Sequence, residues 1–152
     1  MVCAVAVPTA HSGELATKKA LTLSITQEMV AAAKAYAIDK GWNVVIAVVD
    51  DGGHLISLQR MDGAQIGSVE VAERKPKSAI YFKRPTKAFD DGVAGGKTSL
   101  VALPGSLPFA GGLPITVGDQ IIGGIGVSGV TSAQDAEIAQ AALAFLAKTL
   151  AE

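Results

Sequence analysis

The sequence has little of several residue types on which common protein classes depend. A single cysteine among 152 residues, Cys3, can form neither an internal disulfide nor a cysteine-rich metal site. This cysteine usage fits a reducing compartment, so we expect a cytoplasmic rather than a secreted protein. The formal net charge is only −1, which argues against a broad electrostatic surface for DNA or RNA. Nucleic acid is therefore not an expected partner.

Long apolar runs are also missing. Charged residues, glycines or prolines interrupt every run before the roughly 18 apolar residues that a membrane span needs, so no membrane partner is expected. The apolar segment 1–10 is short, contains Pro8 and has no basic residue ahead of it, unlike a secretory signal. We therefore predict an N-terminal arm over residues 1–20 and a single domain over residues 21–152.

The composition that remains is that of a folded domain with an apolar excess. Apolar residues make up 49% and charged residues 18% of the chain, and the mean hydropathy is +0.38. Such a chain can bury a sizeable core, and subunit interfaces can take up the excess apolar surface. We predict a homo-oligomer of at least two subunits.

Hydrophobic periodicity and turn residues predict two helices and two hairpins. A capping-box spacing at 24–27 opens the first helix, which Gly41 can end, and a second capping-box spacing at 131–134 opens the last helix. Turn residues at 50–53 and 118–119 join pairs of β-branched runs. The predicted strands are 44–49, 55–58, 113–117 and 120–127. They predict one mainly antiparallel sheet with the last helix packed on it.

The middle of the chain is less regular. Residues 65–82 have helical composition, but Pro76 lies inside them and predicts a kink or a restart of the helix. Between residues 92 and 129 the chain holds 11 of its 17 glycines, which indicates turns and close backbone approaches. We expect a site or an interface built from loops there.

Three acidic or histidine positions are candidate metal or iron ligands. His54 follows a Gly-Gly turn, where its imidazole can face a cleft and bind iron or can simply hydrogen-bond to the turn backbone. Glu70 and Glu73 lie one helical turn apart and can share a hard cation or form a solvated acidic face. Both pairs of alternatives are open at this point.

Basic residues cluster in one short stretch although the whole chain is near neutral. Six of the 13 Lys and Arg residues fall within residues 74–87: Arg74, Lys75, Lys77, Lys83, Arg84 and Lys87. A positive patch of this kind can hold carboxylates through charge-assisted hydrogen bonds, or can serve solubility alone.

Nucleophilic catalysis finds little support. The sequence has no GxSxG motif and only two histidines, so a serine hydrolase is not expected. If the protein is an enzyme, proton transfer by Asp62, Lys75 or His54 around an anion held by Arg84 is the better candidate.

Several motifs, in this order, resemble those of the GlcG/HbpS family, also called the haem-degrading or DUF336 domain. The stretches that carry the resemblance are 48–55 (Val-Val-Asp-Asp-Gly-Gly-His-Leu), 60–64 (Arg-Met-Asp-Gly-Ala), 84–86 (Arg-Pro-Thr), 111–114 (Gly-Gly-Leu-Pro), 122–129 (Ile-Gly-Gly-Ile-Gly-Val-Ser-Gly) and 134–135 (Gln-Asp). Lys75 and Ser78 match a family helix motif in which Pro76 replaces an alanine.

The resemblance implies an α/β (α+β) sandwich with a mainly antiparallel sheet of about five strands between helices, assembled into dimers or larger oligomers. It implies a small-ligand-binding domain for haem or a related planar carboxylated ligand. The alternative is an enzyme or accessory protein of small organic-acid or aromatic catabolism that uses acid/base chemistry in the same pocket. The ligand-binding candidates are His54, Arg60, Lys75, Arg84, Thr86, Gly111 and Gly112. We expect Lys75 and Arg84 to meet at the mouth of a pocket roofed by the Gly111–Gly112 loop.

Overall fold

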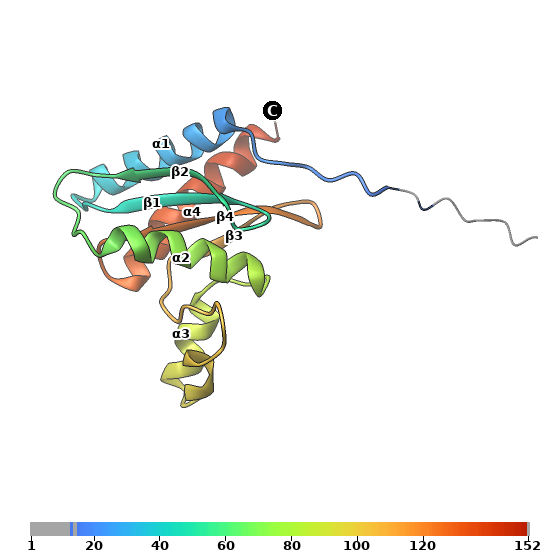
Figure 1. Ribbon diagram of the computed structural model, residues 1–152. Coiled ribbons are helices and arrows are strands. Elements are labelled where there is room, and N and C mark those ends of the chain that lie inside the picture. The colour runs from blue at the N-terminus through green and yellow to red at the C-terminus, as the bar shows by residue number, and fades with distance from the viewer. Residues whose placement is uncertain (1–12, 14, 152) are drawn as a thin grey trace, which may run out of the picture.

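The computed structural model describes residue 13 and residues 15–151. The elements follow in the order α1 (Leu23–Asp39), β1 (Val45–Asp50), β2 (Leu55–Arg60), α2 (Ser68–Tyr81), α3 (Lys87–Ala94), the 3-10 helix η1 (Thr98–Val101), β3 (Gly112–Val117), β4 (Gln120–Ser128) and α4 (Ser132–Thr149) (Figure 1). No helix among these residues is long and apolar enough to cross a membrane.

The strands of this part of the chain form one sheet in the order β2-β1-β4-β3, and every pair in it is antiparallel. Both predicted hairpins, β1–β2 and β3–β4, are confirmed. The sheet has four strands, so the expected number of about five is slightly too high, while the α+β sandwich is correct. The central pair, β1 and β4, joins the two hairpins.

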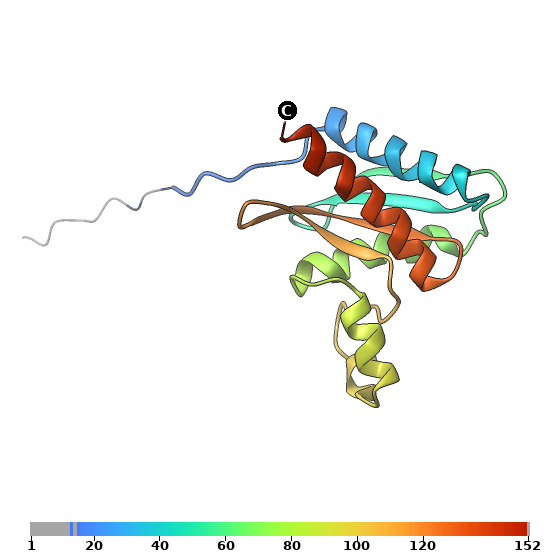
Figure 2. The ribbon, with the colours of Figure 1, turned by 180° about the vertical axis from the view of Figure 1, so that it is seen from behind.

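Helices cover both faces of the sheet. In β1, Ile46 and Val48 pack in the core cluster that contains residues of α1 and α4, whereas Val45 and Ala47 pack with Ala72 of α2. Figure 2 shows α1 and α4 side by side on one face, with α2 on the other. Burial on both faces explains why β1 reads as a continuous apolar run instead of alternating with polar residues.

Helix boundaries follow from capping. The predicted capping box of α4 is present, with Thr131 and Gln134 bonded reciprocally. The first helix instead begins after Thr22, whose side chain accepts a hydrogen bond from the backbone N–H of Ile25, so its predicted start at Ser24 is two residues late. Thr22 is the N-cap residue of α1, because its backbone has the extended conformation that this position requires.

Helix α2 continues through Pro76 as one element instead of restarting after it. Because proline has no N–H, the carbonyl of Ala72 loses its usual helical donor. This carbonyl lies against Gly126 of β4, and the ring of Pro76 packs on Gly124 and Gly126. Because Gly124 and Gly126 have no side chains, α2 packs directly on the backbone of β4.

Helix α3 and η1 form a lobe that projects from the sandwich (Figures 1 and 2). Of the predicted arm, the structure describes residue 13 and residues 15–20. There Lys18 pairs with Asp51 at 2.6 Å, and the backbone N–H of Lys19 donates to Gln120. Cys3 lies outside the described residues, and the boundary between arm and domain at residue 20 stays a prediction.

The substitution Gly126→Ala tests whether the close packing of α2 on β4 stabilises the fold. The new Cβ would collide with Ala72 and Pro76, so we expect a loss of about 1–3 kcal/mol in the free energy of unfolding by urea. Gly67→Ala is the control, since a Cβ there meets no atom within 4 Å. Equal losses in the two variants would contradict the packing argument.

Candidate functional site

Residues from four of the resemblance motifs meet at one end of the sheet. Lys75 of α2 and Asp135 of α4 form an ion pair with an Nζ–Oδ2 distance of 2.8 Å. The ammonium also donates to the carbonyl of Val127 in β4 at 2.7 Å. Lys75 is 1% exposed and Asp135 is 2% exposed. Since α2 and α4 cover opposite faces, this contact ties both helix layers to the end of β4.

The environment of the pair strongly affects its two charges. Burial lowers the pKa of Lys75 and raises the pKa of Asp135, while the attraction between the two groups acts in the opposite direction on each. The backbone N–H of Val130 also donates to Asp135, which favours the ionised carboxylate. The expected place of Lys75 at the mouth of a pocket is therefore wrong. Its ammonium lies inside the molecule, on a carboxylate of its own chain.

Glycine is required beside this pair. A Cβ on Gly111 would lie 2.8 Å from Nζ of Lys75 and 2.8 Å from Cβ of Asp135, and the residue has a φ of 112°. The next residue, Gly112, exchanges hydrogen bonds with Thr86: its N–H donates to Oγ1 of Thr86 at 2.9 Å, and the N–H of Thr86 donates to its carbonyl at 2.9 Å. Thr86 precedes α3 without capping it through its side chain, since its own backbone is already helical. The bonds close the base of the lobe.

His54 lies at a different place, on the turn between β1 and β2. Its side chain is 83% exposed, and Nδ1 lies 3.4 Å from Oδ1 of Asp50. Partial burial raises the pKa of Asp50, but hydrogen bonds from the backbone N–H groups of His54 and Gly52 outweigh it and hold the pKa below its ordinary value. The site of His54 is therefore a tight, acidic turn at the surface.

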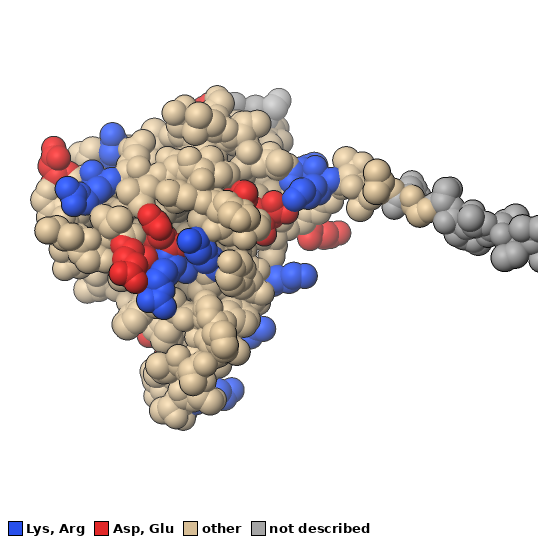
Figure 3. All heavy atoms as spheres, in the orientation of Figure 1, with Lys and Arg blue, Asp and Glu red and all other residues tan. Residues whose placement is uncertain are grey.

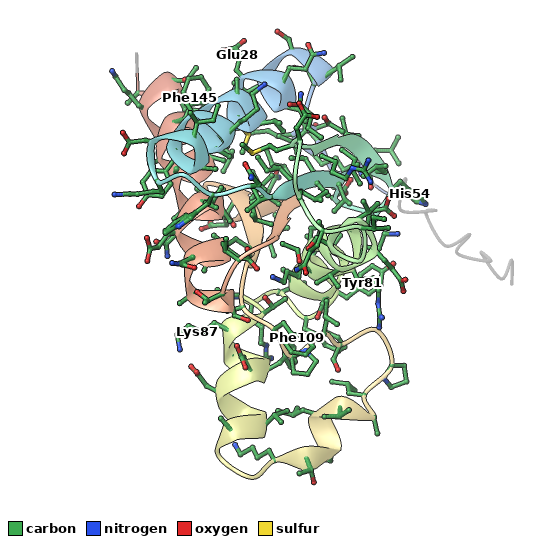
Figure 4. The ribbon with its side chains drawn as sticks, turned by 90° about the vertical axis from the view of Figure 1, so that its left-hand side faces the viewer. Glu28, His54, Tyr81, Lys87, Phe109 and Phe145 are labelled. Atoms are coloured by element: carbon green, nitrogen blue, oxygen red, sulfur yellow. The ribbon has the colours of Figure 1, made fainter. Side chains whose placement is uncertain are left out.

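Tyr81, near the end of α2, lies close to the same turn. A Cβ on Gly53 would be 3.0 Å from the Tyr81 hydroxyl, and one on Gly105 would be 3.3 Å from its ring. Tyr81 is 56% exposed, and Figure 4 shows it below His54 at the same edge of the molecule. Sequence reasoning did not select Tyr81 or Asp50, although the Asp-Asp-Gly-Gly-His turn was a usable indication for Asp50.

Arg84 does not approach Lys75 as expected. Helix α2 ends in a turn in which the N–H of Arg84 donates to the carbonyl of Ala79. The Arg84 guanidinium then donates to the carbonyl of Phe82 and lies 5.7 Å from the centre of the Phe89 ring. Its side chain is thus held outside, near the start of α3.

Three of the six cations in the predicted positive patch are neutralised by carboxylates of the same chain. Arg74 pairs with Glu70 at 3.7 Å, Lys87 pairs with Asp91 at 2.7 Å, and Lys75 is buried. Figure 3 shows Lys and Arg side chains intermixed with Asp and Glu over α2. The other three cations of the cluster have no carboxylate partner among the described residues: Lys77, Lys83 and Arg84.

The remaining candidates lie away from His54. Arg60 and Asp62 lie at the opposite end of β2, where they line an open cleft of about 350 Å³ with Lys34 and Asn43. Glu73 lies on α2 with Glu70, which is engaged by Arg74. Within the described ranges, no group of three or more His, Cys, Asp or Glu residues is arranged to hold a metal ion.

Removing one charge of the buried pair should be costly. We expect Lys75→Met to lower the free energy of unfolding by about 3–5 kcal/mol, because it leaves the Asp135 carboxylate buried without its partner. Lys87→Met, which breaks an exposed pair, should cost about 1 kcal/mol or less. Denaturant titration measures both.

The double variant Lys75→Met/Asp135→Leu separates a missing partner from a packing defect. It should recover stability relative to Lys75→Met, because no uncompensated charge remains. A double variant no more stable than the single one would show that the carboxylate is not the cause.

The chain has the α+β sandwich fold of the solved HbpS structures. The family model described as "Haem degrading protein HbpS-like" matches residues 21–144, and the chain belongs to this family.

Curated and solved relatives agree with this assignment. Protein GlcG of Escherichia coli is 41% identical over 112 residues, which cover 74% of this chain and 84% of that protein. The structure of an HbpS double mutant from Streptomyces reticuli has a TM-score of 0.80 at 35% identity, covering 94% of this chain and 98% of that one. The structure of a PduOC–haem complex has a TM-score of 0.75 at 30% identity, covering 83% and 94%.

Proposed function

We propose that this protein is an oligomeric, cytoplasmic domain that binds haem or a related planar carboxylated ligand against His54 and Tyr81. The observation that carries the proposal is the imidazole of His54, which is exposed at the surface while its Nδ1 side faces Asp50. The PduOC–haem complex, a solved relative with the same fold, supports the choice of ligand class.

The residues around His54 fit such a ligand. Haem supplies an iron that takes a nitrogen ligand and a planar ring with carboxylates. His54 offers the nitrogen, and the Tyr81 ring beside the turn offers an aromatic surface. Lys77, Lys83 and Arg84, on the last turns of α2 and just after it, supply positive charge for carboxylates.

The other ligand-binding candidates have a supporting part in this proposal. Lys75, Thr86, Gly111 and Gly112 fix the end of α2 and the base of the lobe, and so set where Tyr81 and Arg84 lie. They act through packing and hydrogen bonds, without touching the ligand.

A second candidate function is suggested by the cleft at the far end of β2. There Asp62 can act as acid or base beside two cations, Lys34 and Arg60, which suits a small organic acid. This arrangement supports an enzyme or accessory protein of organic-acid or aromatic catabolism. Asp62→Asn would abolish turnover in that case and would leave hemin binding unchanged.

A hemin titration followed by absorbance tests the first function. We expect wild type to bind with a shifted Soret band, and His54→Ala to bind roughly 10- to 100-fold more weakly because the nitrogen that would hold the iron is lost. His11→Ala, which removes the only other histidine, is the matched control and should behave as wild type. Absence of any Soret shift in wild type would rule out haem, and equal behaviour of the two variants would rule out His54.

Assembly is tested separately. The apolar side chains Ile66, Val101 and Phe109 are more than half exposed in the single chain, which favours contact with further subunits. Light scattering at micromolar concentration should give at least twice the 15.4 kDa of one chain. A particle of monomer mass would contradict the predicted oligomer.

A further inference from the structure

The turn that carries His54 is organised around one carboxylate. Oδ1 of Asp50 accepts hydrogen bonds from the backbone N–H of Gly52 at 2.9 Å and from the backbone N–H of His54 at 2.8 Å. The backbone N–H of Asp50 donates in return to the carbonyl of His54 at 2.9 Å. Asp50 therefore holds the backbone of His54 from both directions at the end of β1.

The same carboxylate oxygen also faces the imidazole, at 3.4 Å from Nδ1. Gly52 adds a steric constraint: a Cβ there would lie 3.0 Å from Nδ1 and 3.1 Å from Cε1 of His54. The Nδ1 side of the ring thus rests on the turn backbone. Gly53, with a φ of 88°, is needed for the backbone path, whereas Gly52 does not have a positive φ, so its role is to leave room for the ring.

In an imidazole held in this way, Nδ1 faces the Asp50 carboxylate and Nε2 faces away from the turn. In the neutral ring one nitrogen carries the proton and the other has the lone pair. A carboxylate beside Nδ1 favours the proton on Nδ1, which leaves the lone pair on Nε2, on the outer side of the ring. A carboxylate partner on the second nitrogen also makes a ligand histidine more basic and fixes its orientation.

We propose that Asp50 is the positioning residue for His54, and that Asp50 and Gly52 together form a cradle that presents Nε2 to an iron-containing ligand. This inference rests on the proposed function for the ligand, but the state of the ring is a property of the free protein. Asp51, the adjacent carboxylate, does not share the role, because its side chain pairs with Lys18 at 2.6 Å.

The first test uses the protein without ligand. Nitrogen-15 NMR of the His54 ring should show the Nδ1–H form in wild type and in Asp51→Asn. In Asp50→Asn the amide oxygen can still accept the two backbone hydrogen bonds, so the turn persists while the charge beside Nδ1 is lost. We expect a mixture of both ring forms in that variant. An unchanged Nδ1–H form would overturn the role of Asp50.

The second test uses hemin and a readout of the iron–nitrogen bond. We expect Asp50→Asn to weaken hemin binding about 10-fold, and the iron–histidine stretching frequency of the reduced complex to fall because no carboxylate faces Nδ1 any longer. Gly52→Ala should displace the ring from the turn and weaken binding, since the new Cβ would lie 3.0 Å from Nδ1. Asp51→Asn should match wild type in both measurements.

The two sets of results separate the inference from the function it rests on. If wild type fails to bind hemin, the proposed function is wrong, and the ring NMR alone decides whether Asp50 positions His54. If wild type binds hemin but Asp50→Asn and Asp51→Asn give the same affinity and the same stretching frequency, the positioning role is wrong while haem binding stands.

Discussion

The ion pair between Lys75 and Asp135 is the contact on which the arrangement of the layers depends. Desolvating two charges is costly, and a buried pair is often no more stabilising than well-packed apolar residues. Its value here is geometric. One partner comes from the helix on one face of the sheet and the other from a helix on the opposite face, and the Lys75 ammonium donates both to the Asp135 carboxylate and to the carbonyl of Val127. A placement of α2 and α4 that separated Lys75 from Asp135 would leave two buried charges without partners.

Small residues make this placement possible. Gly111 leaves room for the ammonium, and Gly124 and Gly126 let α2 approach β4 closely enough for Lys75 to reach past the end of the strand. Pro76, which breaks a hydrogen bond within α2, packs on the same glycines. Helix α2 therefore lacks one backbone hydrogen bond at Pro76, and the proline ring instead contacts the sheet. From this fixed helix, Tyr81 projects toward the β1–β2 turn, so a structural contact made from the middle of α2 sets the position of a surface residue at the C-terminal end of the helix.

The division between a structural centre and a surface site explains which candidate residues come together. Lys75, Thr86, Gly111 and Gly112 gather around the base of the lobe and are satisfied by one another and by Asp135. His54 stands apart on a turn with its own carboxylate, and Arg60 and Asp62 occupy the far end of β2. Residues that share motifs of one family thus serve different tasks: some hold the layers, and others face solvent where a ligand can reach them.

The sequence by itself determined the two hairpins, the capping of α4 and the burial of β1, because each depends on contacts between near neighbours or on a periodicity that those neighbours repeat. Its motifs also identified the family. The tertiary structure alone decided that Lys75 is inside and Arg84 outside, since the partner of Lys75 lies 60 residues away and its carboxylate is met only after three layers pack. It also decided the orientation of the His54 ring, which the spacing from Asp50 permits but does not require. Local hydrogen bonding is encoded in short spacings, whereas the environment of a charged side chain is set by which distant segments pack around it.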